Sequence, residues 1–101
     1  MKNAGSIFKA ISDPTRRRIL QMLKDGPLSA GDIASEFDMS APSVSRHLST
    51  LKTAGLIDER RDGNRIIYSL ESESLANCLS EFISSVCPLE QIEAKKRNKK
   101  R

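Results

Sequence analysis

Residues 40–55 combine short hydroxyl side chains with one arginine and one histidine, at spacings that matter if the segment is helical. At about 100° per residue, Leu48 and Leu51 fall within about 40° of Val44, and the three residues predict a buried stripe. Arg46 then points nearly opposite, among small side chains that permit close approach to DNA base edges and phosphates; an arginine can also donate two hydrogen bonds to guanine. The residues predicted to contact a DNA major groove are Ser40, Pro42, Ser43, Ser45, Arg46, His47 and Thr50.

Helix caps must hold that face in place, and the first half of the chain supplies them. Asp13 precedes Pro14; an aspartate at this position accepts a hydrogen bond from an unpaired N–H, and proline has no N–H to lose. The helix that they open ends at residues 25–27, Asp-Gly-Pro. A short apolar pattern at residues 7–11 predicts one helix before it.

Two further helices follow, joined by only residues 38–40. Ser29, with Asp32 three positions later, predicts the start of a helix whose apolar residues 33, 34 and 37 face inward. Ser40 predicts the start of the next helix, which ends at Gly55. Two helices joined by so tight a turn form a helix-turn-helix.

Beyond residue 55 the pattern becomes that of two strands. Residues 56–61 and 65–70 flank Asp-Gly-Asn at 62–64, a strong hairpin signal. The expected fold is therefore mainly α with a small β-hairpin: a winged helix-turn-helix of four helices, two strands and a fifth helix. Polar and cationic residues near the turn are predicted to contact phosphates or a minor groove, the alternative being a solvated hairpin whose charges oppose edge pairing. These wing residues are Arg60, Arg61, Asn64 and Arg65.

From Ser72 onward the helical period returns. Four apolar residues spaced four, three and four apart are typical of a helix that packs against another helix. They are Leu75, Leu79, Phe82 and Val86. Because Pro88 disfavours helical geometry at Cys87, we expect a break or kink there, followed by a weak helix containing Leu89 and Ile92.

Composition limits the partners of the chain. The 101 residues carry a net charge of +4, but the last seven hold six of the 17 basic residues and no acid. This leaves 11 basic against 13 acidic residues in 1–94, a net charge of −2, so the argument for DNA rests on where the charges lie. We expect one domain over 1–94 and a disordered basic tail over 95–101. No apolar stretch suits membrane insertion and no signal peptide is present, which predicts a cytoplasmic location.

The sequence shows no set of residues for catalysis and no metal or cofactor motif. We therefore expect no enzyme activity, no metal site and no cofactor. His47, the one histidine, has no Cys, Asp or Glu three or four positions away on its helix. Cys78 and Cys87 lie nine positions apart, on opposite sides of an ideal helix, and cannot bridge within it. They are interpreted as small buried hydrophobes, with a thiol switch as the alternative.

Several segments together resemble the ArsR (ArsR/SmtB) family of winged-helix repressors. They are residues 13–20 (DPTRRRIL), 43–48 (SVSRHL) with Leu51, 54–57 (AGLI), and the Gly63 hairpin ending in 68–70 (YSL). The resemblance covers about residues 7–87 and implies a homodimer that represses nearby genes, often its own operon, at an imperfect inverted repeat. It also implies dimerisation through the first and last helices. The expected dimer residues are Ile7, Phe8, Ile11, Leu75, Leu79, Phe82 and Val86.

The sequence departs from the metal-sensing members of that family. Residues 30–37 contain no thiol where arsenic sensors carry a cysteine pair, and no histidine follows residue 47. Through its opening, residues 8–17 (FKAISDPTRR), the chain resembles the SdpR-like autorepressors, which lack those metal sites. One alternative is a redox- or arsenite-responsive repressor that uses Cys78 and Cys87. A second is a protein-interaction module or antitoxin. An inducing ligand or anti-repressor protein is not identifiable from the sequence.

Overall fold

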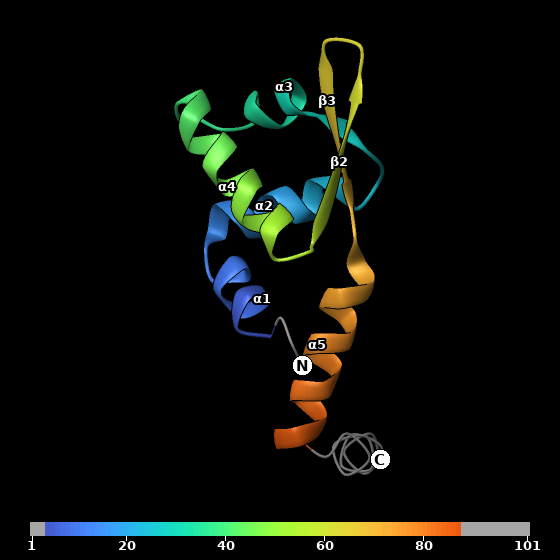
Figure 1. Cartoon of the computed structure of the whole chain (residues 1–101). Coiled ribbons are helices and arrows are strands. Elements are labelled where there is room, and N and C mark those ends of the chain that lie inside the picture. Colours follow the sequence, from blue (N-terminus) through green and yellow to red (C-terminus); the bar gives the residue numbers. More distant parts are fainter. Residues whose placement is uncertain (1–3, 88–101) are drawn as a thin grey trace, which may run out of the picture.

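A computed structural model describes residues 4–87 of the chain as five helices and three strands (Figure 1). The helices run over α1 (Ala4–Ile11), α2 (Pro14–Leu23), α3 (Ala30–Ala34), α4 (Ala41–Thr53) and α5 (Ser72–Val86). The strands are β1 (Leu28–Ser29), β2 (Ile57–Asp62) and β3 (Arg65–Leu70). The predicted winged helix-turn-helix is confirmed, with one strand more than expected. The weak helix beyond Pro88 and the tail over 95–101, with its boundary at 94, lie outside the described residues.

The three predicted helix caps are present. The Asp13 carboxylate accepts a hydrogen bond of 3.1 Å from the Arg16 N–H. Ser29 Oγ accepts from the Asp32 N–H at 3.1 Å, and Ser40 Oγ accepts from the Ser43 N–H at 3.3 Å. Each side chain satisfies one of the N–H groups that a helix start leaves without a partner, which fixes where α2, α3 and α4 begin.

The helix-turn-helix differs from the prediction in the length of α3. We expected Phe37 on that helix, but α3 ends at Ala34, and separate turn hydrogen bonds carry the chain onward. One of them joins the Phe37 N–H to the Ala34 carbonyl at 3.1 Å, and Phe37 packs half-buried against the core. In α4 the predicted stripe of Val44, Leu48 and Leu51 is buried, so the opposite face of this helix points outward.

The sheet has the order β1-β3-β2, and all its pairs are antiparallel. β2 and β3 form the expected hairpin, in which Asp62 pairs with Arg65 and Gly63 has φ +66° at the first turn position. A positive φ there suits glycine and the tight two-residue turns of hairpins. β1 was not predicted: its two residues pair with Ile67 and Tyr68 of β3, and a segment this short shows no alternation.

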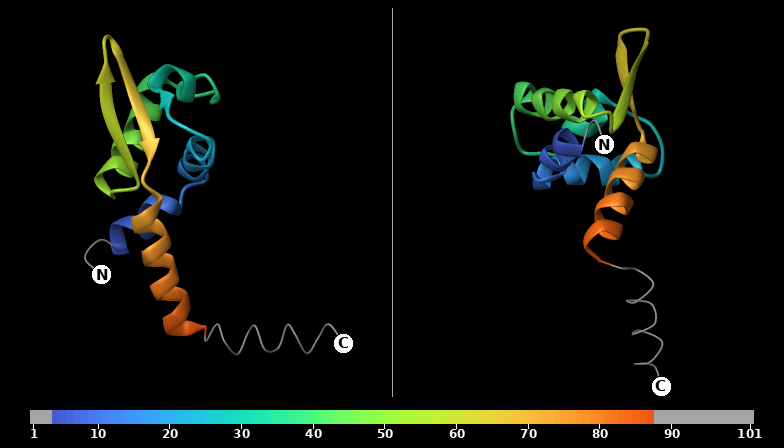
Figure 2. Two further views of the ribbon diagram at one scale, coloured as in Figure 1. Left: turned by 90° about the vertical axis from the view of Figure 1, so that its right-hand side faces the viewer. Right: turned by 60° about the horizontal axis from the view of Figure 1, so that its bottom comes forward.

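The core lies between the helices and the sheet, and α5 extends away from it (Figures 1 and 2). Ile19, Leu23, Ile33, Leu51, Leu56 and Ile57 are its largest fully buried side chains. α5 contributes buried Cys78 to this core, with Leu75 half-buried beside it. As predicted, α5 ends before Pro88, and Cys87 has an extended backbone (φ −129°, ψ 102°). No helix among residues 4–87 is long and apolar enough to span a membrane.

Candidate nucleic-acid interface

The outward face of α4 carries most of the side chains predicted to contact DNA. Ser40, Pro42, Ser45 and Arg46 are exposed, whereas Ser43 and Thr50 are half-buried. Within residues 4–87, Arg46 makes no ion pair, so its guanidinium is available to an external acceptor. This face therefore presents one long cation among short side chains, as the helical angles of the sequence predict.

The hydroxyl groups on this face differ in what they can still donate. Ser40 Oγ and Ser43 Oγ lie 2.9 Å apart and bond each other at the start of α4. Thr50 Oγ1 donates to the Arg46 carbonyl at 3.1 Å, which occupies its hydrogen. Within the described chain, the hydroxyls of Ser45 and Ser49 make no such bond. Among the hydroxyls predicted to contact DNA, Ser45 is therefore the one that has no hydrogen-bond partner within the described chain.

His47 is turned toward α2 rather than fully outward. Its side chain is 22% exposed, and its Nδ1 lies 3.2 Å from Arg16 Nη1 and 3.9 Å from Asp13 Oδ2. A guanidinium offers only donors, so a neutral imidazole accepts through Nδ1 in this contact. His47 thus links α4 to the start of α2.

The arginines at the start of α2 hold α1 in place, a role that sequence reasoning missed. Arg16 donates from Nε to the Ala10 carbonyl at 2.6 Å and from Nη2 to the Lys9 carbonyl at 3.0 Å. Arg17 Nη1 donates to the Ile11 carbonyl at 2.9 Å. These are the last carbonyls of α1, which have no partner within the helix. The spacing in the sequence could have indicated this role. Each arginine lies six or seven residues after the residue whose carbonyl accepts its hydrogen bond, on the far side of the break between α1 and α2.

The environment of Asp13 shifts its pKa. Partial burial by itself raises the pKa, but the hydrogen bond from the Arg16 N–H and the nearby His47 and Arg16 side chains outweigh burial. The pKa of Asp13 is therefore held below its usual value, and the carboxylate stays ionised as the cap of α2.

The wing presents its predicted residues at the surface. Arg60, Arg61, Asn64 and Arg65 are all exposed around the β2–β3 turn. Arg65 Nη2 lies 3.8 Å from Asp32 Oδ2, so this cation also faces the start of α3. Among the described residues, Arg60 and Arg61 form no ion pair, and they follow each other on β2, with side chains on opposite faces.

The junction between α4 and the wing carries an ion pair. The Lys52 ammonium donates to a Glu59 carboxylate oxygen, which connects the last turn of α4 to β2. The hydrogen bond to Glu59 raises the pKa of Lys52, because it favours the charged ammonium. Tyr68, on the strand opposite Glu59, has its pKa raised by burial first and by the Glu59 charge second.

The residues expected at a dimer interface divide between core and surface. Ile7 is only 3% exposed and belongs to the core of the protomer, whereas Phe8, Ile11, Leu75 and Leu79 are half-buried. Phe82 is 46% and Val86 59% exposed. The rings of Phe8 and Phe82 meet edge to face, with centroids 5.3 Å apart, so α1 and α5 contact each other here. Ile83, absent from the prediction, is also exposed.

Both cysteines are free thiols, Cys78 buried and Cys87 half-buried. Within residues 4–87, no group of three or more His, Cys, Asp or Glu side chains is placed to hold a metal ion.

Comparison with known proteins places this geometry in a family. Residues 13–59, which span α2 to the wing, match the model of the bacterial regulatory proteins of the arsR family. The chain is 47% identical over 82 residues to the transcriptional repressor SdpR of Bacillus subtilis, covering 81% of this chain and 91% of that protein. It is 36% identical over 88 residues to the HTH-type transcriptional regulator YgaV of Escherichia coli, covering 86% and 89%.

Solved structures agree with the sequence comparisons. The crystal structure of an ArsR family transcriptional regulator superposes with a TM-score of 0.81 at 29% identity, covering 89% of this chain and 92% of that one. The family and the matched relatives are transcriptional regulators rather than enzymes. The fold, the exposed face of α4 and these similarities lead to one conclusion: the chain belongs to the ArsR family of bacterial regulatory proteins.

Proposed function

We propose that this ArsR-type transcriptional repressor acts as a homodimer that binds an imperfect inverted repeat in DNA and represses its own operon. The observation that carries the proposal is the division of α4 into two faces. Val44, Leu48 and Leu51 anchor one face in the core, and the exposed Arg46 stands on the other. A helix held in this way can enter a major groove with its hydrogen-bonding side chains forward.

The wing supports the same orientation. Its exposed cations Arg60 and Arg61 lie on the strand that directly follows α4, and Lys52–Glu59 ties the two elements together. Figure 1 shows the wing (yellow) rising beside α3 and α4. Phosphate contacts by such cations set the register of a protein on the duplex, whereas contacts to base edges provide the specificity.

The end of α5 supports the homodimer. Among the described residues, four large hydrophobic side chains are exposed, and Phe82, Ile83 and Val86 of α5 are three of them. Phe8 of α1 packs on Phe82, so one apolar surface spans both helices. A second copy can cover it with the same surface, as the two-fold interfaces of dimers do. In such a dimer the two α4 helices meet successive major grooves about 34 Å apart.

Release from DNA in this proposal does not use the family's established metal sites. The thiol-triggered alternative has less support, because Cys78 is 3% exposed and packs in the core. The alternative of a protein-interaction module is disfavoured by the outward face of α4, which lacks the aromatic anchors that dominate protein–protein contacts.

Footprinting on the DNA upstream of its own gene, with the mass of the complex measured in parallel, tests this proposal. We expect two protected half-sites with centres about 10–10.5 base pairs or a multiple apart, and two protomers per repeat. Binding should weaken steeply as salt rises, because phosphate contacts release counterions. Absence of a protected repeat on DNA that the protein retains would contradict the proposal, as would one protomer per site.

A further inference from the structure

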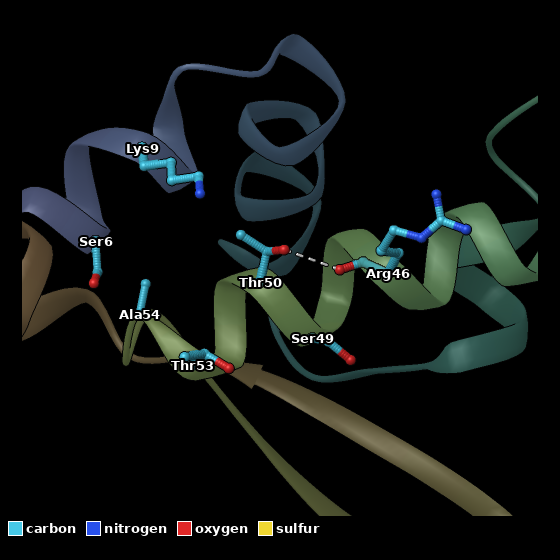
Figure 3. Close-up of a pocket in the computed structure, with 7 residues that line it drawn as sticks. All are labelled: Ser6, Lys9, Arg46, Ser49, Thr50, Thr53 and Ala54. Carbon is cyan, nitrogen blue, oxygen red and sulfur yellow. Dashed lines mark hydrogen bonds between the residues drawn. The ribbon is translucent and has the colours of Figure 1, made fainter.

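A pocket of about 340 Å³ lies between α1 and the outward face of α4 (Figure 3). Among the described residues that line it, two are cations, four carry hydroxyls and none is acidic. They are Ser6, Lys9, Arg46, Ser49, Thr50, Thr53 and Ala54. We call this pocket the α1–α4 groove; its α1 residues, Ser6 and Lys9, are not among those predicted to contact DNA.

Lys9 supplies positive charge to the groove. Figure 3 shows its side chain reaching from α1 toward the side of α4 that carries Thr50. The Arg46 guanidinium instead points away, along α4 toward the start of that helix. Within residues 4–87, Lys9 forms no ion pair, so its ammonium is not neutralised by a carboxylate of the described chain. Lys9 therefore places its charge in the groove, whereas Arg46 places its charge near the start of α4.

The backbone of Lys9 is held firmly relative to α4. Its carbonyl accepts hydrogen bonds from Ser12 Oγ at 2.7 Å, from the Ser12 N–H at 3.3 Å and from Arg16 Nη2 at 3.0 Å. Arg16 also contacts His47 of α4. The backbone at the end of α1 is thus held before any ligand arrives, so binding has to order only side chains.

The hydroxyl groups of the groove suit an oxyanion. Thr50 has already donated its hydrogen to the Arg46 carbonyl. Within the described chain, the hydroxyls of Ser6, Ser49 and Thr53 make no hydrogen bond and remain able to donate. A cation with nearby hydroxyl donors and no acid is the combination that binds phosphate, whose oxygens accept strong charge-assisted hydrogen bonds.

We propose that the α1–α4 groove binds a phosphate group, with Lys9 supplying the charge and Ser6 a hydrogen bond. The inference rests on the proposed function in one respect, because it takes the DNA backbone as the source of the phosphate. A helix seated in a major groove about 12 Å wide has a phosphate strand on each flank. The α1–α4 groove lies beside α4 on its outward side, where such a strand passes. A free phosphate compound is the other source of the same chemistry.

Variants of the full chain separate this site from general electrostatics. Lys9→Gln removes the ammonium that reaches into the groove, and Ser6→Ala removes one of its hydroxyl groups. Lys24→Gln removes one exposed charge elsewhere, beside a pocket lined by Ser69 and Leu70. DNA affinity is measured over a salt series on the upstream DNA and on an unrelated duplex. We expect Lys9→Gln to weaken binding to both duplexes equally and to reduce the slope of log affinity against log salt by about 0.9 per bound protomer. Ser6→Ala should weaken both without altering the slope, and Lys24→Gln should match wild type.

Inorganic phosphate distinguishes the two sources. If phosphate shifts the amide resonances of Ser6 and Lys9 in wild type but not in Lys9→Gln, and the salt slope does not depend on Lys9, the groove takes a free phosphate compound. If Lys9→Gln and Lys24→Gln have the same slope and phosphate shifts neither resonance, the proposed site is refuted. Neither measurement requires sequence-specific binding. The unrelated duplex and inorganic phosphate test the groove even if the wild-type chain does not discriminate between DNA sequences, so failure of the proposed function and failure of this site can be told apart.

Discussion

Arg16 Nη1 of α2 lies 3.2 Å from His47 Nδ1 of α4, and the same guanidinium donates to the last carbonyls of α1. One side chain therefore joins three helices. Asp13 adds to this junction, since its carboxylate caps α2 and lies 3.9 Å from the same imidazole nitrogen. The orientation of α4 depends on this polar junction as well as on its buried apolar stripe.

Replacing Arg16 should destabilise the protein. Arg16→Ala leaves the Lys9 and Ala10 carbonyls without their guanidinium donor and removes the contact to His47. Because hydrogen bonds from a charged donor contribute about 1.5–3 kcal/mol, we expect a loss of that order in the free energy of unfolding by urea. Arg18→Ala is the control: Arg18 is exposed and makes no side-chain hydrogen bond within residues 4–87, so its change should stay within about 0.5 kcal/mol. Equal losses in the two variants would contradict the assignment.

Acid should remove a contribution from Asp13. Because the pKa of Asp13 is lower in the folded protein than its ordinary value of 3.8, its charge stabilises the fold above that value, and this stability is lost as the pH falls through the folded pKa. Asp13→Asn keeps a capping side chain but does not titrate. We expect wild type to be more stable than Asp13→Asn at pH 6 and the difference to shrink below about pH 4. Chemical denaturation at several pH values measures this difference in the free energy of unfolding. A difference that grows toward low pH would contradict a lowered pKa of Asp13.

A charge at the end of α5 should separate the protomers. Val86 is 59% exposed, so Val86→Glu leaves the core of the protomer intact but places a carboxylate in the apolar surface with Phe82 and Ile83. Light scattering should show a mass near that of one chain, with an unchanged circular dichroism spectrum. Ser84→Glu is the matched control, since Ser84 is exposed and lies about 200° from Val86 around the helix. A dimeric Val86→Glu, or a monomeric wild type, would contradict the proposed interface.

The two thiols should react at different rates. Cys78 is buried in the core and Cys87 is half-buried beyond the end of α5. We expect a maleimide reagent to modify Cys87 first and to reach Cys78 only when the core opens, because thiol reactivity requires access. Mass spectrometry with Cys87→Ser and Cys78→Ser variants measures each rate. A Cys78 that reacts as fast as a free thiol would instead favour the thiol-triggered alternative.

The sequence predicted those features that local rules determine. Asp13, Ser29 and Ser40 cap helices as expected, and the angular spacing of Val44, Leu48 and Leu51 identified the outward face of α4. Sequence reasoning missed what depends on contacts between distant segments. The strand at Leu28–Ser29 forms only because β3 lies beside it, and the burial of Ile7 depends on how α1 packs.

The same limit applies to the candidate site. The exposure of Arg46 and the wing cations follows from helical angle and hairpin position, both of which are local. The turn of His47 toward Arg16 and Asp13 brings together residues more than 30 positions apart, and no spacing rule reports it. Cys78, rather than one of the regularly spaced apolar residues of α5, is the most buried side chain of that helix, because the core meets only its first half.

The outward face of α4 is the part of the molecule that we propose reads DNA. The direct measurement is the affinity of wild type and Arg46→Ala for the upstream DNA and for versions with each base pair replaced in turn, with Lys24→Ala as the control. We expect Arg46→Ala to lose about 1–3 kcal/mol and to stop discriminating at one base pair of each half-site, while Lys24→Ala discriminates like wild type. If Arg46→Ala discriminated at every position as wild type does, α4 would not be the reading element and the central claim would be wrong.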